Sequence, residues 1–170
     1  MIEEIFWVVD EEDKVIGTAT RRECHGNPRL IHQVAHVLVF TPSGELWLQK
    51  RSLTKDIQPG KWDTSVGGHL NSGEDYQAAA YRELAEELGI CGVELTYLYK
   101  YPMRNSIESE NVATYMCVFD GKINFDPAEI SEVKAYSLEE IRSRLGSGFF
   151  TPNFEEEFAR YLEWQTNCLG

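Results

Sequence analysis

The stretch GHLNSGEDYQAAAYRELAEELGI, from Gly68 to Ile90, decides the fold of this chain. Its second half is periodic at about 100° per residue, the spacing of an amphipathic α-helix. One face of that helix carries Tyr81, Leu84 and Leu88. The opposite face carries Glu83, Glu86 and Glu87. The pattern predicts a helix over Glu74–Leu88 that docks through its apolar face and presents its acidic face.

Local signals define both ends of this helix. Ser72 is the expected N-cap, with Asp75 three residues later as its capping-box partner, and Gly89 is the expected stop. An acidic helix face is usually only solvated surface. Here, however, Glu83 and Glu87 stand four residues apart, where like charges destabilise a helix by about 0.2–0.5 kcal/mol. A bound cation would reverse this repulsion.

The segment before the helix suits a ligand site. Ser65–His69 contains the pair Gly67-Gly68, and paired glycines let the backbone approach a ligand or a metal closely. Mg²⁺ prefers one or two carboxylates together with substrate phosphates. The glycine pair and the acidic helix therefore indicate a magnesium site.

Composition limits the classes of function. The 170 residues are 42% hydrophobic, enough for one core and too few for two ordinary domains. The net charge of -12 argues against a nucleic-acid polymer as partner. No membrane span or basic secretory start is evident, so we expect a soluble, cytoplasmic protein that makes no membrane contact. Four scattered cysteines form no CxxC pair, so we expect mostly buried thiols in the reduced form.

The rest of the chain predicts a mixed α/β fold without repeats. Short β-branched or aromatic runs predict six strands: Ile5–Val9, Val34–Phe40, Leu46–Gln49, Leu95–Tyr101, Val112–Phe119 and Val133–Tyr136. The segment Thr41–Gly44 predicts a hairpin turn between two of them. Two further helices are expected over Leu138–Leu145 and Asn153–Trp164.

At this point the Gly68–Ile90 stretch resembles a complete Nudix box, with all fixed positions of the 23-residue pattern present. The resemblance implies a Nudix-type α/β/α sandwich with a mixed sheet. Residues 1–170 would form one domain, with the box at 68–90 and the strands of residues 1–33 as an extension. It also implies a hydrolase that uses Mg²⁺ or Mn²⁺ to cleave a diphosphate linkage in a nucleoside diphosphate or related small metabolite.

The resemblance assigns roles to residues of the box. Metal binding falls to Gly67 and to three glutamates, Glu83, Glu86 and Glu87. Arg82 resembles the residue that orients a box glutamate, and Glu74 would support the loop. The general base varies within the family, so Glu83, Glu108 and Glu110 all stay candidates, the last two placed in the loop before the Val112 strand.

A second resemblance is to type I isopentenyl-diphosphate isomerases, a branch of the Nudix superfamily. It rests on Arg21–Phe40, Leu48–His69 and Phe149–Pro152. It implies a second, transition-metal site at three histidines: His25, His32 and His69. It also implies contacts with the substrate diphosphate from Arg21, Arg51 and Lys55. The fourth histidine, His36, is expected to be packed or hydrogen-bonded.

Three departures argue against isomerisation. Gly67 stands where those isomerases carry a catalytic cysteine, Asn153 stands where they carry a tryptophan, and Thr114 falls on a catalytic glutamate. The leading hypothesis is therefore a Nudix hydrolase. An isopentenyl-diphosphate isomerase and a catalytically idle diphosphate-binding module are kept as alternatives. The substrate beyond its diphosphate and the oligomeric state stay open, a homodimer being the commonest closed assembly.

Overall fold

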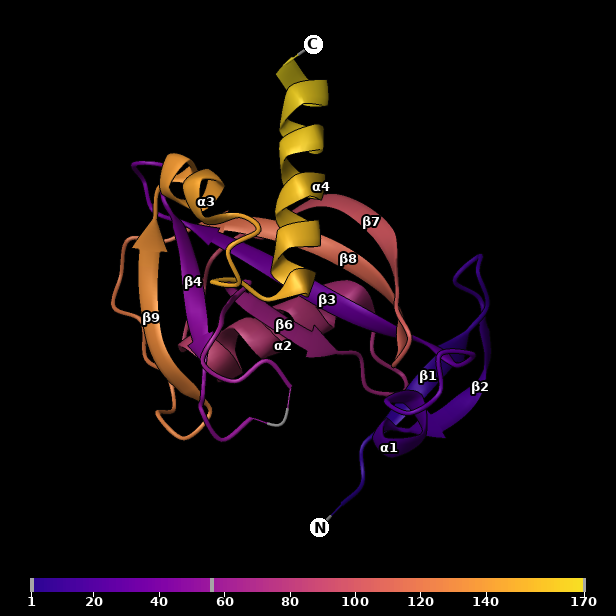
Figure 1. The fold of residues 1–170 in the computed structure, drawn as a ribbon. Coiled ribbons are helices and arrows are strands. Elements are labelled where there is room, and N and C mark those ends of the chain that lie inside the picture. Colours follow the sequence, from indigo (N-terminus) through magenta and orange to yellow (C-terminus); the bar gives the residue numbers. More distant parts are fainter. Residues whose placement is uncertain (1, 56, 170) are drawn as a thin grey trace.

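A computed structural model describes residues 2–55 and 57–169. Nine strands of these residues form one mixed sheet (Figure 1). They are β1 (Ile5–Val9), β2 (Val15–Thr20), β3 (Ile31–Phe40), β4 (Leu46–Arg51), β5 (Trp62–Asp63), β6 (Val66–His69), β7 (Thr96–Arg104), β8 (Ser109–Val118) and β9 (Ile130–Tyr136). The helices are α1 (Arg21–Cys24), α2 (Tyr76–Leu88), α3 (Leu138–Arg144) and α4 (Pro152–Leu169).

Strand β3 is the centre of the sheet because nearly all of its residues are buried. It pairs with β8 in parallel and with β6 in antiparallel register, and it meets β1 and β4 at its two ends. A strand covered on both sides is rich in apolar residues, and here the apolar run Val37–Phe40 is preceded by the polar residues His32, Gln33 and His36. The register places His32 beside Glu110, and His36 beside both Gly67 and Thr114.

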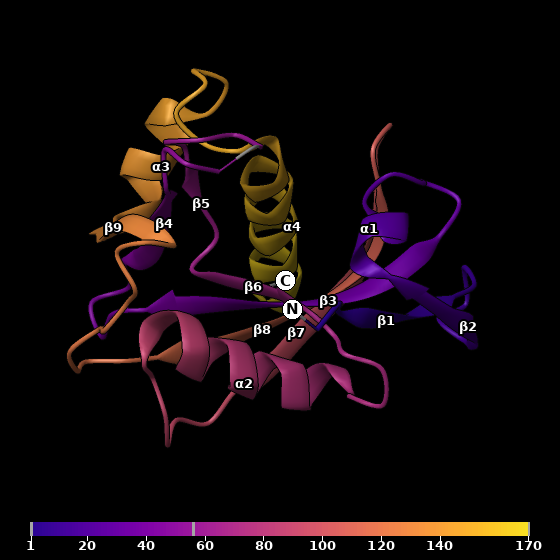
Figure 2. The same cartoon turned by 90° about the horizontal axis from the view of Figure 1, so that it is seen from below.

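Helices α2 and α4 cover opposite faces of this sheet, as Figure 2 shows. Alternate residues of β3 point to opposite faces, so each face has its own core. Ala35 and Val37 pack with Leu84 and Leu88 of α2, and each such leucine contributes about 1.5–3 kcal/mol through burial. Leu38 packs instead with the phenylalanines of α4. The predicted α/β/α sandwich is confirmed.

The start of α2 differs from the prediction. The helix begins at Tyr76 rather than Glu74, and its N-cap is Asp75 rather than Ser72, because the Asp75 carboxylate accepts a bond from the N–H of Ala78. The Glu74 carboxylate instead accepts hydrogen bonds from Arg82 and from the N–H of Asn71. The predicted stop at Gly89 is confirmed, with φ of 67° in the left-handed region.

Several other boundaries also differ. The stretch Ser65–His69, for which no strand was predicted, contains strand β6, whose glycines hid its pairing with β3. Glu110 lies in strand β8, not in the preceding loop, whereas Glu108 does lie in that loop. Sequence patterns missed β2, α1 and β5, and they ended α4 too early. The predicted hairpin turn is confirmed, since the N–H of Gly44 bonds the carbonyl of Thr41.

Two further expectations have structural outcomes. Within the described residues, no helix is long and apolar enough to cross a membrane. All four cysteines are free thiols, but only Cys24 and Cys117 are buried. The expectation of mostly buried thiols is therefore half right, because Cys91 and Cys168 are exposed.

Candidate active site

The glycine pair of β6 brings the backbone against α2. Successive strand residues point to opposite faces, so Gly67 faces α4 and Gly68 faces α2. A Cβ built on Gly68 would lie 2.1 Å from Cδ of Glu83. Only a glycine at position 68 therefore leaves room for the Glu83 carboxylate, which is 15% exposed.

Arg82 holds the loop, the strand and the helix together. Its guanidinium donates two bonds to Glu74 (2.7 and 2.8 Å), one to Glu83 (2.6 Å) and one to the carbonyl of His69 (3.0 Å). The pKa of Glu74 is lowered by this hydrogen bonding. The geometry matches the orienting role that the sequence suggests for Arg82.

Glu87 lies on the same side of α2 as Glu83 and is partly buried. Its carboxylate accepts a bond of 2.8 Å from the Gln49 amide, which also donates to the carbonyl of Ser65. Burial raises the pKa of Glu87 to about 8, and the nearby Glu83 charge adds to this effect. Burial also raises the pKa of Glu83, against the opposing influence of Arg82. Both carboxyls resist ionisation unless a cation joins them.

The acidic face is less open than predicted. Glu86 is 59% exposed, but Glu83 and Glu87 turn toward β6 and are shielded. Within the part of the chain that the structure describes, the three carboxylates do not form one tight group, since Arg82 contacts Glu83 and Glu86 while Glu87 faces Gln49. The metal-binding roles of these three glutamates and of Gly67 stay predictions.

The three predicted histidines do lie together. Single ring nitrogens of His25, His32 and His69 all lie within 4.8 Å of one another. The Nε2 atoms of His25 and His69 are 3.1 Å apart. Phe6 of β1 stacks on the rings of His32 and His69. The β1–β2 hairpin therefore covers one side of this histidine cluster. The expected gathering is confirmed, while ion binding stays a prediction.

Two carboxylates complete the histidine cluster. In a second group, one ligand atom from each of His32, Glu108 and Glu110 lies within 4.8 Å of the other two. The Glu108 carboxylate also lies 3.6 Å from Nε2 of His25. Sequence reasoning considered Glu108 and Glu110 only as bases. The available signal was that Glu108 and Glu110 lie two residues apart shortly before the predicted Val112–Phe119 strand, a spacing that places both side chains on one side of the chain if it is extended there.

The chemistry of the cluster fits a transition metal. Burial lowers the pKa of His32 to about 4, and burial with the neighbouring histidines also lowers the pKa of His69. Neutral imidazoles are the form that binds metal. Both nitrogens of buried His32 lack a hydrogen-bond partner among the described residues. Three nitrogens and two carboxylates suit Zn²⁺ or Mn²⁺ better than an oxygen-seeking Mg²⁺.

The three predicted substrate-binding cations have partners in the protein. Arg21 pairs with Glu4 (2.7 Å) and Lys55 with Glu129 (2.7 Å). Arg51 bonds the carbonyl of Ile57 at 2.9 Å. These contacts are exposed or partly exposed, so a diphosphate can compete for the cations at little cost. Their role in substrate binding stays a prediction.

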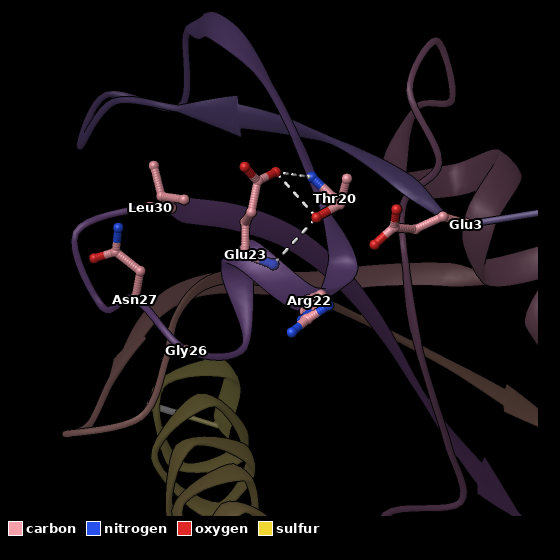
Figure 3. Close-up of a pocket in the computed structure, with 7 residues that line it drawn as sticks. All are labelled: Glu3, Thr20, Arg22, Glu23, Gly26, Asn27 and Leu30. Atoms are coloured by element: carbon pink, nitrogen blue, oxygen red, sulfur yellow. Dashed lines mark hydrogen bonds between the residues drawn. The ribbon is translucent and has the colours of Figure 1, made fainter.

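A surface hollow beside α1 is separate from this constellation (Figure 3). None of its lining residues is a predicted site residue. They are Glu3, Thr20, Arg22, Glu23, Gly26, Asn27 and Leu30. The Glu23 carboxylate is occupied by the backbone and hydroxyl of Thr20, at 2.7 and 3.0 Å. This hollow therefore offers a helix cap rather than catalytic chemistry.

Known proteins are similar to this chain in sequence and architecture. An uncharacterized Nudix hydrolase of Yersinia pestis is 36% identical over 160 residues, which cover 93% of this chain and 86% of that protein. A Photorhabdus laumondii protein named isopentenyl-diphosphate Delta-isomerase 2 is 34% identical over 152 residues, covering 86% and 84%. The crystal structure of DR0079 from Deinococcus radiodurans aligns with a TM-score of 0.81 and 26% identity, covering 92% of this chain and 98% of that one.

The family assignment follows from the box, the fold and these relatives together. The model of the NUDIX domain matches residues 30–162, which include both the glycine pair and the glutamates of α2. The chain therefore belongs to the Nudix hydrolase family.

Proposed function

We propose that this protein is a Mg²⁺-dependent hydrolase that cleaves the diphosphate linkage of a nucleoside diphosphate or a related small metabolite. The observation that carries the proposal is the enclosure of Glu83 and Glu87 around Gly67-Gly68. Two carboxyls whose pKa values are raised by burial lie on one side of α2, and no lysine or arginine neutralises Glu87 within the described residues. A divalent cation is the partner that such a pair lacks.

Each residue of the candidate site has a separate proposed role. Glu83, Glu86, Glu87 and the carbonyl of Gly67 would hold Mg²⁺, which neutralises phosphate charge and lowers the pKa of water. Arg82 orients Glu83 through its 2.6 Å bond, and Arg21, Arg51 and Lys55 would bind the diphosphate oxygens. Glu83 is the base candidate within the helix. Glu108 and Glu110 are better placed as ligands of the second ion, because they face His25 and His32.

The second proposed centre, at the histidine cluster, would take a transition metal. Such an ion would lie on the α4 face of the sheet, where His32, His69 and Gly67 all point. It would add positive charge beside the diphosphate. Through His25, at the end of α1, it would also hold the β1–β2 hairpin against the rest of the sheet. Phe6 would then form an apolar wall for the bound ion.

Isomerisation is the second candidate, because a relative with 34% identity is named an isopentenyl-diphosphate isomerase. The structure argues against it at position 67. Gly67 offers no thiol, and a side chain added there would meet Cδ2 of His36 at 3.1 Å. A side chain at this position would therefore require the His36 ring to move by a few tenths of an ångström.

Both candidates are tested by one screen. Nucleoside diphosphates, nucleotide sugars and prenyl diphosphates are incubated with Mg²⁺, with and without Zn²⁺. Phosphate release is measured beside conversion of isopentenyl diphosphate; for the nucleotide sugars, alkaline phosphatase is added so that the two monophosphate products release phosphate. We expect phosphate release from at least one compound, and loss of most of that activity in Glu87→Gln. Isomerase activity without phosphate release would refute the hydrolase proposal, as would full activity of Glu87→Gln at saturating Mg²⁺.

A further inference from the structure

A charged side chain of α4 is buried beside the candidate active site. Glu157 is 0% exposed, and burying a carboxylate is costly unless hydrogen bonds compensate. Its Oε1 accepts a bond of 2.7 Å from the Thr114 hydroxyl, and its Oε2 accepts one of 3.0 Å from the Tyr99 hydroxyl. Nδ1 of His36 lies 3.3 Å from Oε1. Three elements, β3, β7 and β8, thus direct donors at one carboxylate of α4.

This arrangement favours one tautomer of His36. The Thr114 and Tyr99 hydroxyls donate to Glu157, and Nδ1 of His36 is the third donor of this set when it carries the ring proton. In the neutral ring, Nε2 then keeps its lone pair and acts as an acceptor. The expectation that His36 is packed or hydrogen-bonded is confirmed for Nδ1, but it leaves Nε2 without a role.

Nε2 of His36 faces the glycine pair. The β3–β6 register sets His36 opposite Gly67, and a Cβ on Gly67 would lie 3.3 Å from Nε2. Gly67 is exposed and the His36 side chain is 13% exposed, so solvent reaches this point. Among the described residues, Nε2 has no hydrogen-bond partner, yet it is not sealed from solvent.

The same face of the sheet leads from His36 to the histidine cluster. His32 and His36 are four residues apart in β3, roughly 13 Å along a strand. Both point to the face that Gly67 and His69 also share. A diphosphate bound between the glycine pair and the histidine cluster would place its organic group within reach of His36.

We propose that His36 is a specificity determinant whose Nε2 accepts a hydrogen bond from an N–H or O–H group on the organic part of the diphosphate substrate, with Glu157 as the positioning residue. The inference rests on the proposed function and narrows its substrate class. A prenyl chain carries no such donor and would leave Nε2 desolvated without a partner. A nucleobase amino group or a sugar hydroxyl satisfies it.

The test separates the organic part of the substrate from its diphosphate. His36→Phe, Glu157→Gln and the control Glu156→Gln are compared with wild type; Glu156 is the adjacent glutamate, 39% exposed and paired with Arg160. KM and kcat are measured for the best nucleoside diphosphate of the screen. Ki is measured for methylenediphosphonate, which has the diphosphate shape and no organic group. Analogues lacking one amino or one hydroxyl group then identify the donor.

We expect His36→Phe to raise KM about tenfold, the worth of one hydrogen bond, with little change in kcat and an unchanged Ki for methylenediphosphonate. Glu157→Gln should also raise KM, because Nδ1 need no longer carry the proton, and Glu156→Gln should not. An unmoved KM in His36→Phe overturns the inference, and so does a parallel rise of KM and Ki. If wild type hydrolyses no diphosphate, the proposed function fails first and the inference fails with it.

Discussion

Replacing Glu87 by glutamine should stabilise the metal-free protein at alkaline pH while removing its activity. Burial raises the pKa of Glu87 to about 8 in the folded chain, from 4.5. The stabilisation that comes from holding the proton is complete below pH 4.5, and it is lost as pH rises through 8. Above that pH the folded state must hold an ionised carboxylate that it shields from water.

The size of the effect follows from this difference in pKa. The interval from 4.5 to 8 corresponds to at most about 5 kcal/mol of lost stability. Relaxation and water penetration reduce such values, so we expect Glu87→Gln to gain about 2 kcal/mol at pH 9. For a chain of this length, that is a rise in Tm of about 4–8 °C. The glutamine carbonyl can still accept the bond from Gln49.

The assay is thermal unfolding in EDTA at pH 5 and pH 9, followed by circular dichroism. Glu86→Gln is the matched control, because Glu86 is 59% exposed and should change Tm little at either pH. Mg²⁺ at 100 times its Kd should stabilise wild type by about 2.7 kcal/mol and cancel the advantage of Glu87→Gln. A variant no more stable than wild type at pH 9, or equally stabilised by Mg²⁺, would contradict this reasoning.

Three further predictions follow from the site. Gly68→Ala should lower kcat/KM about 100-fold, because the new Cβ would displace the Glu83 carboxyl; unchanged kinetics would show that this carboxyl needs no fixed place. His32→Ala should weaken Zn²⁺ binding at least about tenfold by calorimetry while leaving Mg²⁺-dependent hydrolysis measurable, and superimposable titrations would rule out the histidine metal site. Neither wild type nor Gly67→Cys should exchange solvent deuterium into isopentenyl diphosphate; metal-dependent exchange by wild type would favour the isomerase instead.

The box was predictable from sequence because its signals are local. Helical spacing of Leu84 and Leu88 located α2, and the left-handed glycine after it marked the end. The start was misjudged because Ser72 and Asp75 are both good N-caps, and the bonds that Glu74 accepts from Arg82 of α2 and from the N–H of Asn71 hold the chain before Asp75 in a turn. Local propensity cannot choose between two caps when a distant partner decides.

The rest of the site depends on strand register, which sequence patterns do not give. The parallel pairing of β3 with β8 joins residues that are 78 positions apart and sets Glu110 beside His32. No local periodicity of either strand contains that alignment. Glu157 was missed for a related reason, since a glutamate within the run Glu155–Glu157 looks like solvated helix surface until the packing of α4 is known.

Strand β6 links the two proposed metal centres. Its successive residues face opposite sides of the sheet, which explains the positions of the two glycines. Gly68 faces α2 and admits the Glu83 carboxyl, whereas Gly67 and His69 face α4. The His69 carbonyl is also held by Arg82, the residue that orients Glu83. The helix carboxylates and the histidine cluster are therefore positioned by the same four-residue strand. A shift of β6 would disturb both centres together, so loss of zinc at the histidines should alter the response of hydrolysis to Mg²⁺ even though the two ions share no side chain.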